Sequence, residues 1–297
     1  MSAKTPFRAG FVSFVGRPNV GKSTLMNALV GEKIAITSSK PQTTRHAIRG
    51  IVHRPGGQVI IVDTPGLHRP RTLLGSRLND LVASTLSDVD VIAMCVPADE
   101  KVGPGDRYIA SHIASFPNAK RVAVVTKTDD QKPEVIAERL IEVDQLGEWE
   151  AIIPVSAQSG HQLEVLVAEL LARLPESPPL YDDSHTTEQT EENRISELIR
   201  EATLEGVQDE LPHSIAVTID DIETANGLTT IYANLFVERD SQKGIIIGKG
   251  GQKLKDIGSR ARAEIEQMLG TKVHLSLMVK VSKEWQRDAK KIERLGL

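Results

Sequence analysis

The stretch GRPNVGKS, residues 16–23, constrains the fold of this chain more than any other feature. It follows the apolar run FVSFV and precedes the helix-forming segment TLMNALV, so the pattern G-x4-G-K-[ST] stands between a predicted strand and a predicted helix. Glycines let the backbone N–H groups of such a loop point inward, and the positive end of the following helix faces the same space. The segment therefore predicts a phosphate-binding loop.

Two side chains of this loop are expected to act on bound phosphates. Lys22 supplies a positive charge to the outer phosphates, and the Ser23 hydroxyl supplies a ligand for Mg²⁺. The residues expected to contact a nucleotide here are Gly16, Arg17, Pro18, Asn19, Val20, Gly21, Lys22, Ser23 and Thr24.

Residues 11–174 alternate short β-branched apolar runs with amphipathic stretches. The predicted strands lie near 11–15, 58–62, 89–96, 121–126 and 151–155, and the predicted helices near 22–30, 72–86, 105–115, 134–146 and 161–174. Such alternation predicts an α/β domain in which helices cover both faces of a mainly parallel sheet. Ligands of this architecture bind at the carboxyl ends of the strands.

The segment PESPPLYDD, residues 175–183, ends this alternation with three prolines. The elements predicted after it are a helix near 190–206, strands near 214–222 and 228–237, the loop GIIIGKGG, a helix near 252–269, a strand near 272–281 and a terminal helix near 283–294. We therefore expect a first domain at 1–178, a linker at 179–190 and an α+β domain at 191–297.

Composition places the chain among ordinary globular proteins, with 40% hydrophobic and 26% charged residues in a length of 297. No run approaches about 18 consecutive apolar residues, and the start MSAKTPFRAG lacks the apolar core of a secretory signal. The single cysteine, Cys95, lies within VIAMCV, where we expect a small buried hydrophobe. These features favour a cytoplasmic protein.

The net charge of -4 hides a division along the chain. Residues 1–181 carry 20 basic and 19 acidic side chains, 182–238 carry two basic and 14 acidic, and 239–297 carry 14 basic and seven acidic. An acidic stretch is often only a solvated face, whereas a basic tail is typical of proteins that bind a polyanion.

The tetrad DTPG, residues 63–66, ends the apolar strand QVIIV about forty residues after the phosphate loop. Asp63 is expected to hold Mg²⁺ through a water, and the N–H of Gly66 to reach a γ-phosphate. Thr64 and Pro65 complete this expected contact segment.

The tetrad TKTD, residues 126–129, ends the strand RVAVV in the place of an N-K-x-D signature. A carboxylate at Asp129 accepts hydrogen bonds from two donors of guanine that adenine lacks, so GTP is favoured over ATP. Thr126 departs from the usual asparagine, and we expect a weaker or rearranged contact there. Lys127 would lie along the base, and in the later segment SAQSG, Ser156 and Ala157 would face the guanine oxygen.

Residues 40–48, KPQTTRHAI, form a polar segment between the first two motifs. Thr43 or Thr44 would complete Mg²⁺ coordination when GTP is bound and release it after hydrolysis. Motif alignment favours Thr44, and Thr43 remains open. The expected catalytic residues are then Lys22, Thr44 and Gly66.

The residue after D-x-x-G, where some small GTPases carry a catalytic glutamine, is Leu67. An aliphatic side chain cannot orient water, so another device is needed. Asn19 is one candidate, because resemblance to potassium-dependent GTPases suggests that it holds a monovalent cation. His68 and Arg69 are a second, weaker pair of candidates. We expect slow hydrolysis that rises in potassium.

The tetrad Gly248-Lys249-Gly250-Gly251 forms a G-x-x-G loop before a basic helix. A K-homology (KH) fold presses such a loop against about four unpaired nucleotides, because side chains there would hold the strand away. Ile245 and Ile246 would pack under bases or fill the core, with at least one isoleucine of this run in the core. The residues expected to contact RNA are Lys243, Ile247, Gly248, Lys249, Gly250, Gly251, Lys253 and Lys255.

Together, GRPNVGKST, PQTTRH, DTPGLH, TKTD, SA and VERDSQKGIIIGKGGQKLKDIG resemble the Era GTPases of bacteria over essentially the whole chain. The resemblance implies a P-loop GTPase domain followed by a type II KH domain. It also implies binding near the 3′ end of small-subunit (16S) ribosomal RNA, a role in assembly of that subunit, and peripheral association with the inner membrane face in some members. Thr126 and Gly250 depart from the commonest family pattern. We expect a monomer.

Two other functions are considered. A different ribosome-linked or tRNA-modifying GTPase would show a second phosphate loop or a further catalytic domain, and the sequence contains neither. An RNA-binding module that is gated by nucleotide but scarcely hydrolyses GTP would differ in its turnover with and without single-stranded RNA.

Overall fold

The computed structural model describes residues 6–38, 43–66, 72–207 and 214–297, which divide into two compact units. The first unit comprises Met1–Ala35, Thr44–Arg69 and Arg77–Glu188, and the second comprises Ile36–Thr43, Pro70–Ser76 and Gln189–Leu297. The chain thus passes from one unit to the other more than once before the second unit is completed.

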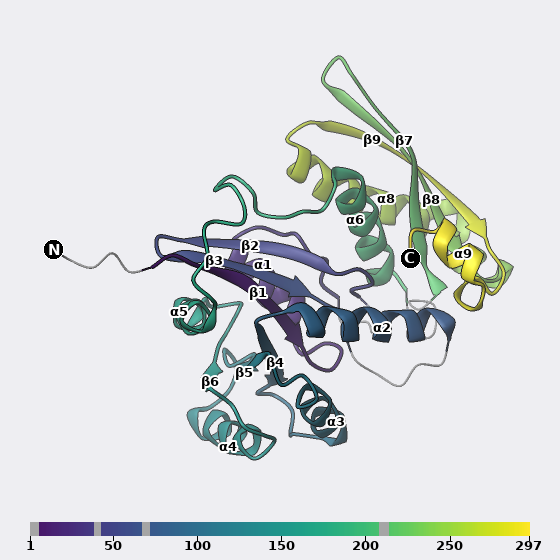
Figure 1. The fold of residues 1–297 in the computed structure, drawn as a ribbon. Helices are drawn as coiled ribbons and strands as arrows, with labels where there is room; N and C mark the ends of the chain where they lie inside the picture. The colour runs from purple at the N-terminus through teal and green to yellow at the C-terminus, as the bar shows by residue number, and fades with distance from the viewer. Residues whose placement is uncertain (1–5, 39–42, 67–71, 208–213) are drawn as a thin grey trace. The chain divides into compact units, whose positions relative to one another are not determined.

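A six-stranded sheet forms the centre of the first unit (Figure 1). Its strands are β1 (Arg8–Val15), β2 (Ile48–Arg54), β3 (Gly57–Asp63), β4 (Val91–Pro97), β5 (Lys120–Thr126) and β6 (Ala151–Pro154), in the order β2-β3-β1-β4-β5-β6. All neighbouring strands are parallel except β2, which is antiparallel to β3. Every residue of β3 and β4 is buried, because both faces of a parallel sheet are covered.

The helices of the described residues that accompany this sheet are α1 (Lys22–Val30), α2 (Leu73–Asp88), α3 (Pro104–Ile113), α4 (Pro133–Asp144) and α5 (Leu163–Arg173). One apolar core joins α1 and α5 to one face, through residues such as Leu25 and Leu166. A second core joins α2, α3 and α4 to the other face, through residues such as Val82, Ile109 and Val143. The predicted mainly parallel sheet with helices on both faces is confirmed.

Strand β2 was not among the predicted strands. Its sequence, IRGIVHR, mixes charged side chains with Gly50, so the apolar run is too broken to indicate a strand. A Cβ at Gly50 would lie only 2.6 Å from Ile34 Cδ1, so any larger residue would force the side chains packed on this strand to shift. On its outer side, the N–H of Ile51 donates to the carbonyl of Thr186, which covers part of the edge.

The second unit is built on a three-stranded sheet in the order β7-β8-β9. Its described elements are α6 (Glu191–Glu205), β7 (Ala216–Ala225), β8 (Leu228–Val237), α7 (Asp240–Ile247), α8 (Gln252–Leu269), β9 (Lys272–Val281) and α9 (Ala289–Arg294). β7 is antiparallel and β9 parallel to β8. Apolar residues of α6, α7 and α8 pack with β8 and β9 in one core, as the α+β KH prediction requires.

Two boundaries in this unit differ from the prediction. Residues 240–247 form helix α7, although their glycine and isoleucine run GIII suggested a loop. The terminal helix begins at Ala289 because Glu284 is left-handed (φ 49°), Trp285–Arg287 form a 3-10 turn, and Asp288 caps the N–H groups that follow. Within the described ranges, no helix is both long and apolar enough to span a bilayer.

Candidate nucleotide and nucleic-acid sites

The predicted phosphate loop connects β1 to α1 at the carboxyl end of the sheet. Gly21 takes the left-handed conformation that ends the loop (φ 94°). Among the described residues, no side chain caps the start of α1, and its first turn contains no acidic residue. The first N–H groups of a helix lack intrahelical partners, so this helix start is suited to an anion.

Lys22 points back across this loop. Its Nζ donates to the carbonyl oxygens of Gly16 at 3.2 Å and of Arg17 at 3.0 Å, so the ammonium group lies inside the loop. Burial lowers the pKa of Lys22, although the carboxylate of Asp63 acts in the opposite direction. A Cβ at Gly16 would lie 2.6 Å from the carbonyl oxygen of Cys95, so the loop floor has no room for a larger residue.

Cys95 itself is fully buried beneath this loop, as expected for a small hydrophobe. Burial raises the pKa of its thiol to about 12, so the reactive thiolate is scarce at neutral pH.

The three residues predicted to hold Mg²⁺ lie together. The hydroxyls of Ser23 and Thr44 donate to Asp63 Oδ2 at 2.6 Å and 3.0 Å, and the two hydroxyl oxygens are 3.2 Å apart. The hydroxyl of Thr43 instead donates to the carbonyl of Ser38, at 3.5 Å. The Thr44 hydroxyl, which motif alignment favours, therefore lies in this cluster beside Ser23 and Asp63.

The carboxylate at the end of β3 suits a divalent ion. Asp63 is fully buried, and its Oδ1 has no hydrogen-bond partner among the described residues. Burial raises the pKa of Asp63, opposed by Lys22 and by the hydroxyls of Ser23 and Thr44. A buried charged oxygen without a partner is costly, and a hard cation or its bound water would satisfy it. The two hydroxyls and one carboxylate are oxygen donors that fit Mg²⁺.

The residues after Asp63 lie against the phosphate loop. The Thr64 hydroxyl donates to the carbonyl of Phe14 at 3.2 Å, which fixes the turn to β1. Pro65 is buried. A Cβ at Gly66 would lie 3.1 Å from atoms of Pro18, so only a small residue fits this approach.

A pocket of about 300 Å³ lies beside the phosphate loop, a size within the range of small-ligand sites. Its lining includes the predicted base-contacting residues Thr126, Lys127, Asp129 and Ala157, together with Gly21 and Thr24 of the first motif. These motifs are separated by up to 136 positions in sequence, and the carboxyl ends of β1, β5 and β6 bring them to one place.

Three hydrogen bonds fix the polar groups of this pocket. The Ser156 hydroxyl donates to Asp129 Oδ1 at 2.7 Å and accepts from the N–H of Ser159 at 3.0 Å, so the carboxylate is held in one orientation. The Thr126 hydroxyl donates to the carbonyl of Val20 at 2.6 Å. The threonine thus ties the end of β5 to the phosphate loop, and the weaker or rearranged nucleotide contact expected at this position stays a prediction.

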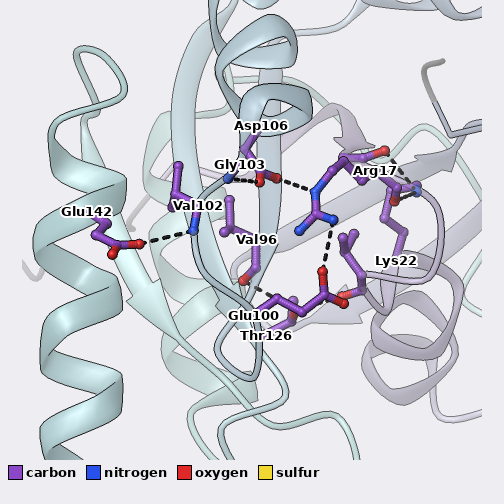
Figure 2. Close-up of polar contacts among 11 residues, drawn as sticks. Arg17, Lys22, Val96, Glu100, Val102, Gly103, Asp106, Thr126 and Glu142 are labelled. Atoms are coloured by element: carbon purple, nitrogen blue, oxygen red, sulfur yellow. Dashed lines mark hydrogen bonds and ion pairs between the residues drawn. The ribbon is translucent and has the colours of Figure 1, made fainter. Parts of the chain in front are cut away.

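Figure 2 shows a polar network that the sequence did not indicate. Arg17 Nε donates to Asp106 Oδ1 at 2.8 Å, and its Nη1 donates to Glu100 Oε2 at 2.9 Å. Asp106 is fully buried and also accepts from the N–H of Gly103. Gly105 leaves room for the arginine, since a Cβ there would lie 2.7 Å from Arg17 Cδ. The network fastens the phosphate loop to the start of α3.

The candidates for assisting hydrolysis are not tested by this geometry. His68 and Arg69 lie outside the described residues, as does Leu67, which stands where some GTPases carry glutamine. Asn19 is exposed and takes a positive φ of 66° within the phosphate loop. Its proposed potassium site remains a prediction.

The G-x-x-G loop lies between α7 and α8 in the second unit. Gly248, Gly250 and Gly251 all have positive φ, of 71°, 61° and 78°, so the loop has a backbone path that favours glycine. Lys243 and Ile247 belong to α7, Lys253 and Lys255 belong to α8, and Lys249 lies in the loop. Ile246 is fully buried whereas Ile245 is 51% exposed, so the isoleucine run is divided between core and surface.

Comparison with known proteins assigns both units. Residues 11–127 match a family described as a 50S ribosome-binding GTPase, and residues 210–286 match the KH domain family. The chain is therefore a P-loop GTPase with a C-terminal KH domain.

Similar proteins define the family more closely. The chain is 58% identical to GTPase Era of Mycolicibacterium smegmatis, covering 98% of this chain and 99% of that protein, and 57% identical to GTPase Era of a Nocardioides species, covering 97% and 96%. A solved structure of Era with MgGDPNP and nucleotides 1506–1542 of 16S ribosomal RNA is 36% identical, with a TM-score of 0.94 over 98% of this chain and 99% of that one. An Aquifex aeolicus Era variant bound to GDP·AlF4⁻ is 35% identical over the same shares, also with a TM-score of 0.94. This chain belongs to the Era family of GTPases.

Proposed function

We propose that this protein binds GTP with Mg²⁺, hydrolyses it to GDP and phosphate, and binds the 3′ region of 16S ribosomal RNA during assembly of the small ribosomal subunit. The bound ligands of the similar Era structures support the nucleotide and RNA parts of this proposal: MgGDPNP and nucleotides 1506–1542 in one, and GDP·AlF4⁻ in the other. The family resemblance of the whole chain supports the role in assembly.

The cluster of Ser23, Thr44 and Asp63 carries the nucleotide part of this proposal. It gathers two hydroxyls around a buried carboxylate that has one oxygen without a partner among the described residues. Mg²⁺, when bound by these residues, neutralises phosphate charge. The N–H groups at the start of α1 and the ammonium of Lys22 bind and orient the phosphates, and they stabilise the charge that develops as the terminal phosphate leaves.

Guanine is selected by the pocket after β5. Asp129 is held by Ser156, so its carboxylate is already oriented before a base is bound. In this pose it accepts from the two guanine donors, whereas adenine would leave the charge without a donor. The Ala157 N–H and the stem of Lys127 complete the contacts with the base.

Equilibrium dialysis tests the nucleotide part. Purified full-length protein is dialysed against labelled GTP, GDP or ATP, with and without Mg²⁺, and phosphate release is measured in parallel. We expect retention of guanine nucleotides only and hydrolysis only with Mg²⁺. A chain that retains no guanine nucleotide in Mg²⁺, or that retains ATP equally, would contradict the proposal.

The RNA part rests on the loop Gly248–Gly251 and on the lysines of α7 and α8. The open space around Gly250 and Gly251 leaves their backbone accessible to a sugar-phosphate chain. Cross-linking of the protein to RNA from purified small subunits tests it, and we expect the cross-links to map to 243–255 of the protein and to the 3′ end of the RNA. Cross-links elsewhere on the protein would show that another surface binds RNA.

Further properties belong to the proposal: a potassium site, the location in the cell, the oligomeric state, membrane association and the domain limits. We infer that Asn19 holds K⁺, and equal hydrolysis rates in potassium and sodium buffers would refute this. The protein is proposed to be a cytoplasmic monomer that also associates with the inner membrane face, which sedimentation and fractionation of cells would test. The domain limits 1–178, 179–190 and 191–297 stand as proposals that limited proteolysis would check.

A further inference from the structure

A buried carboxylate at the start of α3 anchors an arginine of the phosphate loop. Asp106 is fully buried, and each of its two oxygens accepts a hydrogen bond. Oδ2 accepts from the N–H of Gly103 at 2.9 Å, and Oδ1 accepts from Nε of Arg17 at 2.8 Å (Figure 2). The first contact fixes the carboxylate to its own helix, so the second contact can hold the arginine in one place.

Helix α3 gives this carboxylate a firm support. The helix begins at Pro104, and its residues Ile109 and Ile113 are buried in the core on one face of the sheet. Just before the helix, the N–H of Val102 donates to Glu142 Oε2 of α4 at 3.0 Å. The start of α3 is therefore held both by the core and by α4, which restricts its movement.

The side chain of Arg17 is engaged by a second carboxylate as well. Its Nη1 donates to Glu100 Oε2 at 2.9 Å (Figure 2). The Arg17 side chain is 26% exposed, whereas that of Asp106 is not exposed at all. A hydrogen bond between charged groups is roughly twice as strong as one between neutral groups. The two carboxylates therefore hold the guanidinium at the start of α3 and offset its charge.

The backbone of Arg17 holds the lysine that is expected to bind the outer phosphates. The Arg17 carbonyl oxygen accepts from Lys22 Nζ at 3.0 Å, and the carbonyl oxygen of Gly16 accepts from the same ammonium at 3.2 Å. The carbonyl and the side chain of a residue are joined to the same Cα, and few backbone dihedral angles are free to separate them. A displacement of the Arg17 side chain would therefore shift the Lys22 ammonium as well.

We propose that Asp106 and Arg17 are positioning residues for Lys22, so that their ion pair sets the place of the ammonium and, through it, the rate of GTP hydrolysis. The inference rests on the proposed function, since both residues act on the phosphates through Lys22. Asp106 touches neither the nucleotide nor Mg²⁺ in this role, and the Arg17 side chain acts on the loop. Small displacements of a group that stabilises the transition state lower the rate steeply.

A direct contact between the Arg17 side chain and the phosphates would give the opposite result. An arginine that reached the phosphates would itself stabilise the charge that develops there. Loss of its carboxylate partner would free it for that contact, so Asp106→Asn would leave the rate unchanged or raise it. A double-mutant cycle separates the two roles, because residues that act as one unit have effects that do not add.

The test measures GTP hydrolysis by full-length protein under single-turnover conditions over a range of protein concentrations. Asp106→Asn removes the negative charge and keeps the shape of the side chain, and Arg17→Met removes the donors and keeps the length. The double variant completes the cycle. Glu142→Gln is the matched control, because it also turns a carboxylate beside this loop into an amide but does not touch Arg17.

We expect Asp106→Asn to lower the rate constant at saturation by about tenfold, with a change of less than about threefold in the half-saturating concentration. Arg17→Met and the double variant should lower the rate constant by the same factor, and Glu142→Gln should match the unaltered protein. An unchanged or raised rate in Asp106→Asn, or losses that multiply in the double variant, would overturn the inference. Failure of the unaltered protein to hydrolyse GTP would instead refute the proposed function.

A further comparison shows whether the ion pair acts through Lys22. In a Lys22→Ala background the ammonium is absent, so Asp106→Asn should have no further effect on the residual rate. Phosphate release with protein in excess over GTP measures this rate. A second loss of about tenfold in that background would overturn the inference, because it would show that Asp106 merely supports the fold.

A milder variant covers the case in which Asp106→Asn does not fold. Arg17→Lys keeps a positive charge beside the buried carboxylate, but an ammonium cannot reproduce the planar fork that spans Asp106 and Glu100. We expect a folded protein, by circular dichroism, with a rate constant lowered by about threefold. A rate constant equal to that of the unaltered protein would refute the role of the Arg17 guanidinium.

Discussion

The glycine loops before α1 and α8 differ in how firmly the surrounding residues hold them. The loop before α1 is fixed by Lys22 across its backbone, by Thr126 at Val20 and by Arg17 on Asp106. Around Gly250 and Gly251 of the loop before α8, an added Cβ would meet no atom within 4 Å.

The difference matches two kinds of ligand. A small phosphate group must be surrounded by donors in a fixed geometry, because catalysis depends on placing charge where it develops. An RNA strand needs a smooth, open backbone and positive charge along its path. The first loop therefore holds its polar groups in a fixed arrangement before a ligand binds, whereas the second loop leaves its backbone open to a long ligand.

The largest effect is expected from removing the positive charge inside the first loop. Lys22→Ala should lower the rate constant of GTP hydrolysis by about 10²–10³-fold, because one preorganised donor to the transferred phosphate is lost. Phosphate release under single-turnover conditions measures it. Lys101→Ala, at an exposed position, is the control. A similar rate in both variants would show that the Lys22 ammonium does not accelerate hydrolysis.

Charge reversal in the second loop should affect RNA alone. Gly250→Asp combined with Lys249→Asp should lower RNA affinity by about 100-fold or more, since two negative side chains face phosphates, while GTP affinity stays near normal. Fluorescence anisotropy with an RNA of nucleotides 1506–1542 measures this change. Lys290→Asp, on exposed α9, controls for net charge; unchanged RNA binding in the double variant would place the RNA surface elsewhere.

An intermediate effect is expected on the affinity for guanine nucleotides when Asp129 is changed. Asp129→Asn should weaken GTP binding by about 30-fold, because a charge-assisted hydrogen bond is lost, and should improve binding of xanthosine triphosphate, whose C2 carbonyl accepts from the new amide. Competition against a fluorescent guanine nucleotide reports both. Asp130→Asn lines the same pocket and serves as the control. Equal losses from both substitutions would argue against guanine recognition by Asp129.

The smallest expected effect concerns the contact between Thr126 and the phosphate loop. Thr126→Val removes the hydroxyl that donates to Val20 without changing the shape of the side chain, and it should weaken GTP binding by about fivefold. Thr126→Ser, which keeps the donor, should bind as the unaltered protein does. If valine and serine behave alike, the hydroxyl does not stabilise the loop.

Contiguous motifs made the nucleotide site predictable from the sequence. GRPNVGKS, DTPG and TKTD each combine glycine, charge and a preceding apolar run, and the parallel sheet then brings their strand ends together. Strand β2 and helix α7 were not predicted because Gly50 and Gly244 interrupt their apolar runs, and tertiary packing decides their structure.

No sequence pattern indicated the contacts between residues that are far apart in the sequence. Arg17 and Asp106 are 89 positions apart, and either one alone has the appearance of an ordinary charged residue. Arg200 and Glu201 lie in the acidic stretch 182–238, a composition that is often only a solvated face, yet both side chains are buried. Their roles depend on which backbone groups the fold places opposite them, and sequence patterns do not contain that information.

The assignment of Ile36–Thr43 to the second unit has a consequence for dissecting this protein. A fragment that ends at Glu188 retains the complete sheet, but it loses α6 and with it the core that buries Ile36 and the carboxylate that accepts from Thr37. Such a truncation would expose an isoleucine and leave the half-buried N–H of Thr37 without the carboxylate that accepts from it. The motifs of the GTPase domain suggest that it folds by itself. We expect a fragment that ends at Glu188 to be less stable than the same residues in the intact polypeptide.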